Sequence, residues 1–282
     1  MLNKFFKTIH NKYSRFFKFI FFLRYLFAIF FVSISLFLII PGFFNYEKKE
    51  KIIKNYFLES YNFKISKYEN IKYKAFPIPR LELKKTRITF LKSNTNFNVN
   101  YLQIYPKIFS IYNLNNFEVN KIILKENDVN LKTSNFYTFI NELSKQRKKI
   151  FFNDLNIKIV NDDKLVVGLE NIFFSNFGYK KNFIKGKVFG KRFEAKLEDN
   201  LEFIEFKLPN SSITTNLDLN KKTKRGTFKS KILSNHLKFD FEHDSEKLKI
   251  FNSYFRSKNL SFNNEASITF TPFLDIKTNF EL

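Results

Sequence analysis

The 282-residue chain contains no cysteine and no tryptophan, and it has only one methionine, six glycines and three histidines. The absence of cysteine excludes disulfides, thiolate nucleophiles and cysteine metal sites, although it fits reducing and oxidising compartments equally. The glycines are scattered, so the sequence holds no glycine-rich phosphate cradle and no Gly-x-Ser-x-Gly elbow. Most of the common catalytic motifs are therefore missing.

The three histidines form no recognisable site. His10 lies in a basic N-terminal leader, and His236 and His243 flank one predicted strand and its exit turn. The spacing of the last two matches no metal-ligand pattern. The carboxylates along the predicted strands alternate with lysines, as solvent-facing partners do. We therefore expect no enzymatic activity, no metal site and no cofactor.

Acidic residues are scarce relative to basic ones, 26 against 49, which gives a net charge of +23. Such a charge attracts nucleic acid, but the sequence has no recognition helix, zinc-finger spacing or RNP-like signature. Lysine, asparagine, isoleucine and phenylalanine are all abundant, with 41 phenylalanines, as an AT-rich coding sequence produces. We interpret the charge as a solvated surface, with attraction to anionic lipid head groups as the alternative and no nucleic-acid partner.

One long apolar run, residues 16–40, is closed by Pro41-Gly42. Its uncharged part, residues 25–40, would extend roughly 24 Å as a helix. With residues 19–23, and with Arg24 reaching toward the head groups, it approaches the ~20 residues that span a bilayer. A cleaved signal peptide is disfavoured because the basic region is long and no Ala-x-Ala site follows. The charged flanks argue against a buried core helix, so we predict an uncleaved anchor.

The charges beside the anchor predict its orientation. The basic residues that precede or enter the span, with no acidic residue among them, are Lys4, Lys7, Lys12, Arg15, Lys18 and Arg24. By the positive-inside rule the N-terminus lies in the cytoplasm and the body lies outside it. We therefore divide the chain into a basic cytoplasmic leader (1–24), a transmembrane anchor (25–42), a juxtamembrane helix (43–60) and an extracytoplasmic β domain (61–282).

In the body the apolar residues recur with a period of two, which is typical of half-buried antiparallel strands. The runs that keep one phase are Leu155, Ile157, Ile159, Leu165, Val167, Leu169 and Phe173; Ile213, Thr215, Leu217 and Leu219; and Leu237, Phe239 and Phe241. The clearest run places Ala266, Ile268, Phe270, Leu274, Ile276, Phe280 and Leu282 on one face. The sequence predicts a mainly β fold of roughly a dozen strands.

A few short helices interrupt the strands. Asn45 is a candidate cap for the juxtamembrane helix, residues 106–112 predict one helical turn, and residues 134–147 predict a surface helix. The helix faces expected to pack comprise Ile52, Ile53, Tyr56 and Phe57 in the first helix and Phe136, Phe139, Ile140 and Leu143 in the last. Turn-forming residues predict connectors at 94–96, 113–116 and 126–128.

The order of these features resembles the N-terminal module of the AsmA family of bacterial envelope proteins. The most telling segments are Pro79-Arg80-Leu81-Glu82-Leu83 and Val119-Asn120-Lys121-Ile122-Ile123-Leu124. In the family, a Pro-x-Leu-x-Leu-like strand is similarly followed by a strand, a short helical turn and a further strand pair. The resemblance covers residues 25 to about 143, and the rest of the chain is β-compatible.

The resemblance implies a single-pass protein of the bacterial inner membrane, with a curved antiparallel sheet folded like a gutter in the periplasm. Its apolar inner face would carry phospholipid acyl chains, in phospholipid transport or outer-membrane assembly. The lipid-facing candidates are Ile268, Phe270, Leu274, Ile276 and Phe280. The alternation equally fits a closed sandwich core made by the same residues. The alternative function is an anchored, non-enzymatic scaffold that recruits other envelope proteins by edge-strand pairing.

The expected length limits such a gutter, because a dozen strands at ~4.8 Å each reach only about 60 Å. Members of the family are often much longer. We therefore expect either a short member that works with partner proteins or a part of a longer chain.

The predicted orientation can be tested with a reporter fused after Leu282. A reporter enzyme that is active only in the periplasm should be active there, and one that is active only in the cytoplasm should be silent, because the positive flank stays inside. The opposite pair of activities would refute the topology.

Overall fold

The computed structural model describes residues 14–161, 164–179, 181–198, 201–244, 247–269 and 275–281. The helices are α2 (Ser14–Ile39), η1 (Ile40–Phe43), η2 (Glu47–Lys49), α3 (Glu50–Tyr61), η3 (Ile108–Ile111), η4 (Leu114–Asn116), α4 (Thr133–Ser144) and η6 (Pro209–Ser211). The strands are β1 (Phe63–Lys67), β2 (Asn70–Lys74), β3 (Arg80–Phe90), β4 (Thr95–Pro106), β5 (Val119–Lys132), β6 (Ile150–Asn161), β7 (Lys164–Ser175), β8 (Phe183–Val188), β9 (Lys191–Glu198), β10 (Phe203–Leu208), β11 (Ile213–Asn220), β12 (Arg225–Ile232), β13 (Asn235–His243), β14 (Lys247–Arg256), β15 (Ser261–Thr269) and β16 (Asp275–Glu281).

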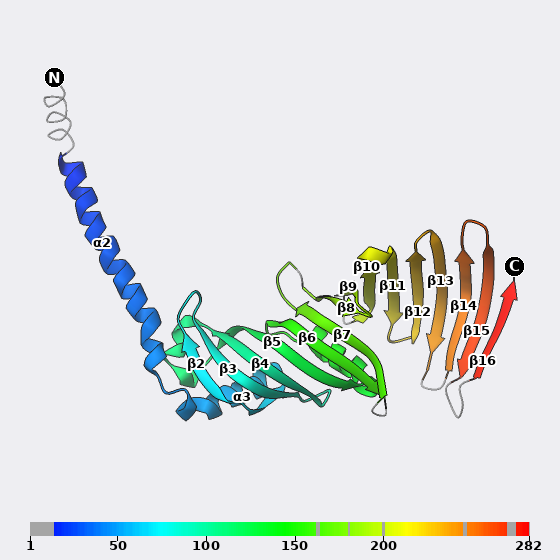
Figure 1. Cartoon of the computed structure of the whole chain (residues 1–282), viewed down its shortest axis with the longest axis horizontal. Coiled ribbons are helices and arrows are strands. Elements are labelled where there is room, and N and C mark those ends of the chain that lie inside the picture. The colour runs from blue at the N-terminus through cyan, green and yellow to red at the C-terminus, as the bar shows by residue number, and fades with distance from the viewer. Residues whose placement is uncertain are drawn as a thin grey trace, which may run out of the picture.

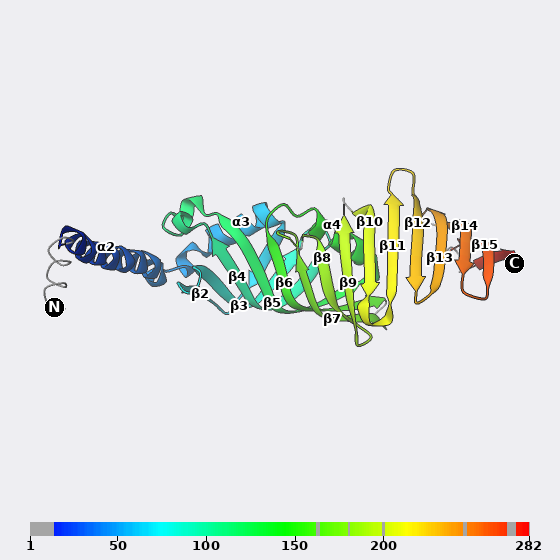
Figure 2. The same cartoon turned by 90° about the horizontal axis from the view of Figure 1, so that it is seen from above.

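All these strands belong to one open, curved sheet, so the predicted mainly β fold is confirmed and the gutter is favoured over the closed sandwich. The strands follow one another in sequence order along the long axis of the molecule, and β2 pairs beside β1 on the edge of β3 (Figures 1 and 2). Sixteen strands form the sheet, which is more than the dozen expected. Neighbours are antiparallel except for β5 and β6.

The parallel pair determines where α4 lies. A connection between adjacent parallel strands must cross one face of the sheet, and the segment between β5 and β6 does so as α4. Phe139 and Leu143 of α4 are buried against the sheet while Tyr137 is exposed, so the predicted surface helix with one packing face is confirmed. No side chain caps its first turn. The carboxylate of Glu142 accepts hydrogen bonds from the Ser93 backbone N–H (3.1 Å) and hydroxyl (2.9 Å), which ties α4 to the β3–β4 turn.

A line of residues with positive φ crosses the sheet on strands β3, β5, β6 and β7. Lys85, Glu126, Asp154 and Asn171 have φ of 45°, 54°, 61° and 51°, and the register places these residues near the same level of their strands. We call these four residues the bulge line. At this level the inward-facing residues of strands β3 to β7 jump by three positions, and among these strands the pairing register shifts only between β6 and β7, as in a β-bulge. The inward-facing buried residues on the two sides of the line are Leu81, Leu83, Thr86, Ile88 and Phe90 in β3; Phe97, Val99, Leu102 and Ile104 in β4; Ile122, Leu124, Asn127, Val129 and Leu131 in β5; and Ile150, Phe152, Leu155, Ile157 and Ile159 in β6.

The bulge line corrects two sequence expectations. Residues 126–128 are not a connector, because β5 continues through them with a positive φ at Glu126. Phe173 does not share the phase of Val167 and Leu169, because the bulge at Asn171 turns it to the opposite face, where its ring meets Phe151 at 4.6 Å. The turns near residues 94 and 113–116 are confirmed.

The helix α2 is long and apolar enough to cross a membrane, with a candidate span at Lys18–Phe43. The candidate span includes the predicted anchor and part of the predicted leader. Residues 1–13 of that leader lie outside the described part of the chain. Asn45 accepts a hydrogen bond from the Lys48 backbone N–H (3.2 Å), so the predicted cap is confirmed. The buried residues Ile53 and Phe57 place α3 on the body.

Tyrosines of the body hold the end of α2. Pro41 has no N–H for the carbonyl of Phe37, four residues earlier, and the Tyr112 hydroxyl donates to that carbonyl instead. The Tyr73 hydroxyl donates to the carbonyl of Leu38 at 2.8 Å, and partial burial raises the pKa of Tyr73. The Tyr112 and Phe37 rings stack with centroids 4.7 Å apart. The carbonyls that a helix end leaves unpaired are thus bonded to β2 and to the β4–β5 connection.

A buried carboxylate stabilises the strands next to this junction. Glu82 on β3 is buried, and it accepts from the Lys74 ammonium (2.9 Å) and from the Gln103 amide (3.2 Å). Burial alone raises the pKa of Glu82, but the bonds from Lys74 and Gln103 and the charge of Arg80 outweigh it. The pKa is therefore lowered from its ordinary value of 4.5.

Because the pKa of Glu82 is lower in the folded chain, its contribution to the free energy of unfolding is complete above pH 4.5 and is lost as the pH falls through the folded pKa. Glu82→Gln should therefore lower the free energy of unfolding by about 1 kcal/mol at neutral pH and by less at low pH. Denaturant unfolding in detergent across this pH range measures the difference. Glu69→Gln, which breaks an exposed pair with Lys85, is the control and should change little; an unchanged pH profile in Glu82→Gln would refute the assignment.

Candidate functional site

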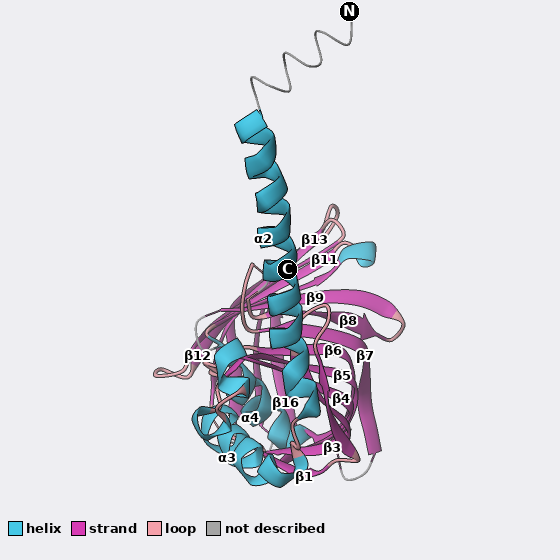
Figure 3. Cartoon of the chain, turned by 90° about the vertical axis from the view of Figure 1, so that its left-hand side faces the viewer, coloured by secondary structure: helices cyan, strands magenta, loops and turns pink. Residues whose placement is uncertain are grey.

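The face of the sheet on which α3 and α4 lie is called here the inner face. Figure 3 shows the strands curving around these two helices. Alternation along each strand places mostly apolar side chains on the inner face, with a few polar ones such as Thr86 and Asn127, and it places most lysines and carboxylates on the other face. The register keeps them aligned: Leu197 pairs with Ile204, which pairs with Leu217, which pairs with Phe228.

Phenylalanine rings follow one another across this face from strand to strand. Offset and edge contacts between aromatic rings at 4.5–7 Å stabilise such rows beyond their burial. The ring pairs and centroid distances are Phe63–Phe90 5.5 Å, Phe90–Phe97 5.1 Å, Phe97–Phe152 5.8 Å, Phe152–Phe174 5.9 Å, Phe193–Phe206 5.7 Å, Phe228–Phe239 4.7 Å and Phe255–Phe262 5.2 Å. The abundance of phenylalanine is therefore partly structural.

Two glycines make room for rings of the inner face. Gly226 on β12 pairs with Phe241, and a Cβ at Gly226 would lie 2.4 Å from the Cζ of that ring and 2.5 Å from the Asp218 carbonyl oxygen. Gly186 on β8 pairs with Phe193, whose Cε1 would be 3.1 Å from a Cβ at Gly186. An aromatic ring covering a cross-strand glycine is a known way to fix strand register.

The cover on the inner face ends partway along the sheet. The helix α3 packs on the first strands, and α4 packs on β4 to β6, where Phe139 contacts Phe97 at 5.4 Å. Beyond β8 no described helix crosses the sheet, and the inner-face residues of β11 to β15 are mostly half-buried. The inner face is thus a closed core near α2 and an open apolar surface farther away.

A cavity lies where the cover ends. Its volume is about 280 Å³, and every lining residue is apolar. The lining residues are Phe136, Phe139, Ile140 and Leu143 of α4; Phe152, Leu155 and Ile157 of β6; Leu169, Ile172 and Phe174 of β7; Ile184 and Val188 of β8; Phe193, Ala195 and Leu197 of β9; and Ile204 and Phe206 of β10. This cavity volume is roughly nine times the ~30 Å³ that one water molecule occupies in the liquid. The cavity can therefore hold a segment of one hydrocarbon chain.

The lipid-facing candidates from the sequence lie at the far end of the sheet. Ile268 on β15 pairs with Ile276 on β16, and Ile276 is 58% exposed. Phe270 and Leu274 lie outside the described residues, and so does the side chain of Phe280, whose backbone pairs with Asn264. The sequence did not predict the cavity, although the alternation of Phe193, Ala195 and Leu197 was its local signal.

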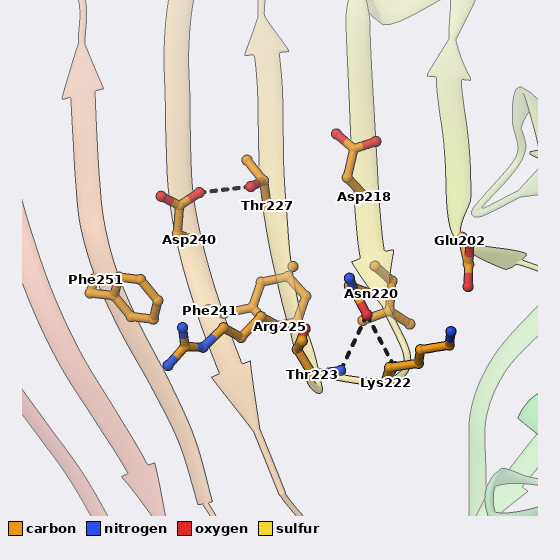
Figure 4. A pocket seen from close by; sticks show the side chains of 12 residues that line it. Glu202, Asp218, Asn220, Lys222, Thr223, Arg225, Thr227, Asp240, Phe241 and Phe251 are labelled. Carbon is orange, nitrogen blue, oxygen red and sulfur yellow. Dashed lines mark hydrogen bonds between the residues drawn. The ribbon is translucent and has the colours of Figure 1, made fainter.

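A larger, polar hollow of about 760 Å³ lies beside the β11–β12 turn (Figure 4). Asp240 there accepts bonds from the Thr227 hydroxyl (2.7 Å) and the Asn252 amide (3.1 Å), and these two bonds lower its pKa. Asn220 accepts bonds from the backbone N–H groups of Lys222 and Thr223 in its own turn. The polar groups are thus used within the sheet, which indicates a solvated surface.

Within the described residues, no group of three or more histidines and carboxylates is placed to hold a metal ion. His236 and His243 lie at the two ends of β13, as expected, and remain apart from any such group. Comparisons with family models, with curated proteins and with solved structures gave no match to this chain. The apolar inner face with its cavity is the candidate site.

The fit of Phe241 over Gly226 gives a stability prediction. Gly226→Ala should lower the free energy of unfolding by about 1–3 kcal/mol, because the new methyl group meets the ring and a backbone oxygen. Gly168→Ala is the matched control, because a Cβ there meets nothing within 4 Å. Equal unfolding free energies for the two variants would show that the ring does not depend on the glycine.

Proposed function

We propose that the chain is a membrane-anchored protein that holds hydrocarbon chains of phospholipids along its inner face. The observation that carries the proposal is the mainly apolar inner face, interrupted by the Thr215–Ser230 pair, which α3 and α4 cover only near α2. An apolar surface that no second layer covers usually marks a site for an apolar partner. The resemblance to the AsmA family supports a phospholipid as that partner, in phospholipid transport or outer-membrane assembly.

The mechanism is passive. Each methylene group that leaves water for the inner face contributes ~0.8 kcal/mol, and the head group stays in solvent at the open side of the curved sheet. The cavity under α4 receives the end of one acyl chain, since it has no polar lining group to orient a head group. No chemical step is required of any side chain.

In this proposal α2 spans the bacterial inner membrane, the N-terminus is cytoplasmic and the β body lies in the periplasm. The fifteen strands on the path from β1 to β16 extend about 70 Å at ~4.8 Å per strand. A body of this length holds lipid between the membrane and a partner protein of the envelope. The non-enzymatic scaffold that pairs by edge strands is the alternative, and it needs no lipid on the inner face.

The deciding experiment is native mass spectrometry of the full chain, extracted in mild detergent, for bound phospholipid. We expect bound phospholipid in the wild-type protein. A lipid-free protein would refute lipid holding and leave the scaffold.

Two variants locate the lipid. Ile204→Lys places a charge among apolar lining residues of the cavity, so the variant should lose most of the bound phospholipid. Val166→Lys is the control, because Val166 is 55% exposed and does not line the cavity, so it should keep wild-type lipid. Circular dichroism checks that both variants keep the sheet; equal lipid loss in both would refute the assigned site.

A further inference from the structure

A set of exposed apolar side chains surrounds the lower end of α2. Phe43 follows the helix end, Phe76 and Ile78 lie in the β2–β3 loop, and Ile108 and Phe109 lie in η3. These five residues are called the rim. Phe43 is 85% exposed and Phe109 is 80% exposed, which is unusual for such large side chains beside a folded body.

The two segments that carry the other four rim residues are the β2–β3 loop and the β4–β5 connection, and both lie at the same end of neighbouring strands. The residues that begin β3 pair with those that end β4, Leu81 with Ile104, so the β2–β3 loop and the β4–β5 connection are neighbours. Strand β2, which leads into the first loop, contacts α2 through Tyr73 and Leu38, and the β4–β5 connection contacts it through Tyr112 and Phe37. Figure 1 shows this end of the sheet beside the lower end of α2.

The loops are held in shape with their apolar residues outward. The Arg80 guanidinium donates to the carbonyls of Phe76 (3.1 Å) and Ile78 (3.2 Å). The Ser110 hydroxyl lies 2.8 Å from the carbonyl of Lys107 and 2.9 Å from that of Glu118. These bonds hold backbone carbonyls of both loops in place, and the apolar side chains of the rim remain exposed.

The depth of the rim follows from its contact with α2. The Phe109 ring lies 6.1 Å from the ring of Phe37, and Phe37 lies within the candidate span Lys18–Phe43. Phe37 is six residues from the end of that span, which corresponds to about 9 Å of helical rise. A ring beside Phe37 is therefore at the depth of the head groups or the upper acyl chains when α2 crosses a bilayer.

We propose that the rim is a membrane-binding surface, which inserts into the same bilayer that α2 spans. Aromatic side chains concentrate at this depth of membrane proteins, and bilayer contact removes the rim from water. The inference rests on the proposed span of α2 and is independent of lipid holding by the inner face.

The sequence contains no tryptophan, so each Phe→Trp variant has one tryptophan whose fluorescence reports on one position. The full chain is reconstituted in phosphatidylcholine vesicles as Phe109→Trp, as Phe30→Trp in the middle of α2, and as Phe189→Trp. Phe189 is the matched control, since it is 83% exposed in the β8–β9 turn, away from α2. Spin-labelled phosphatidylcholine and acrylamide serve as membrane and solvent quenchers.

We expect Phe109→Trp to lose most of its fluorescence to a spin label near the glycerol backbone and to shift its emission to the blue. Phe30→Trp should be quenched best by a label near the end of the acyl chain, and Phe189→Trp should be quenched by acrylamide alone. If Phe30→Trp is quenched by lipid and Phe109→Trp behaves like Phe189→Trp, the rim inference is wrong while the span stands. If lipid quenches none of the three, the span itself is refuted, and the rim inference with it.

Discussion

The structure depends on keeping one face of a very long sheet apolar. In a strand, a shift of one residue turns every later side chain to the opposite face. A single bulge in one strand would therefore expose a row of phenylalanines and bury a row of lysines. In this chain the positive-φ residues Lys85, Glu126, Asp154 and Asn171 lie at a common level of the sheet, so the strands change phase together and the inner face keeps its apolar residues.

The helices divide the sheet into a two-layer region and a one-layer region. Near α2 the chain has two layers, and side chains such as Phe57, Phe97 and Phe139 are buried as in an ordinary globular core. Beyond β8 it has one layer, in which glycines such as Gly226 let rings lie flat across neighbouring strands. The parallel step between β5 and β6 creates the boundary, because it requires a crossing helix and the antiparallel turns that follow do not. The cavity lies at this boundary for the same reason.

The sequence predicted what depends on local pattern. The apolar helix, the cap at Asn45, the turn at 106–112 and the two-residue alternation were all visible, and the β architecture followed from them. It did not predict the phase changes within strands, because turn-forming residues such as Glu126-Asn127-Asp128 have the same composition at a phase change as in a connector. The spacing Leu-x-Leu-x-x-Thr-x-Ile, which recurs with other apolar residues from β3 to β7, was the available signal. Local sequence pattern could not predict the cavity, because Phe136 and Phe206 come together only through the order of the strands.

The hydrogen bonds from Tyr73 and Tyr112 to the last turn of α2 hold the helix and the sheet in one fixed relative orientation. In the proposed membrane arrangement, a body on a flexible tether would sample many directions, whereas this body would follow the tilt of α2. Transmembrane helices adopt tilts from 0° to about 40°. For a sheet of about 70 Å, each change of about 10° in tilt would carry its far end through about 12 Å. The thickness of the membrane, which influences helix tilt, would in this way set where β16 reaches.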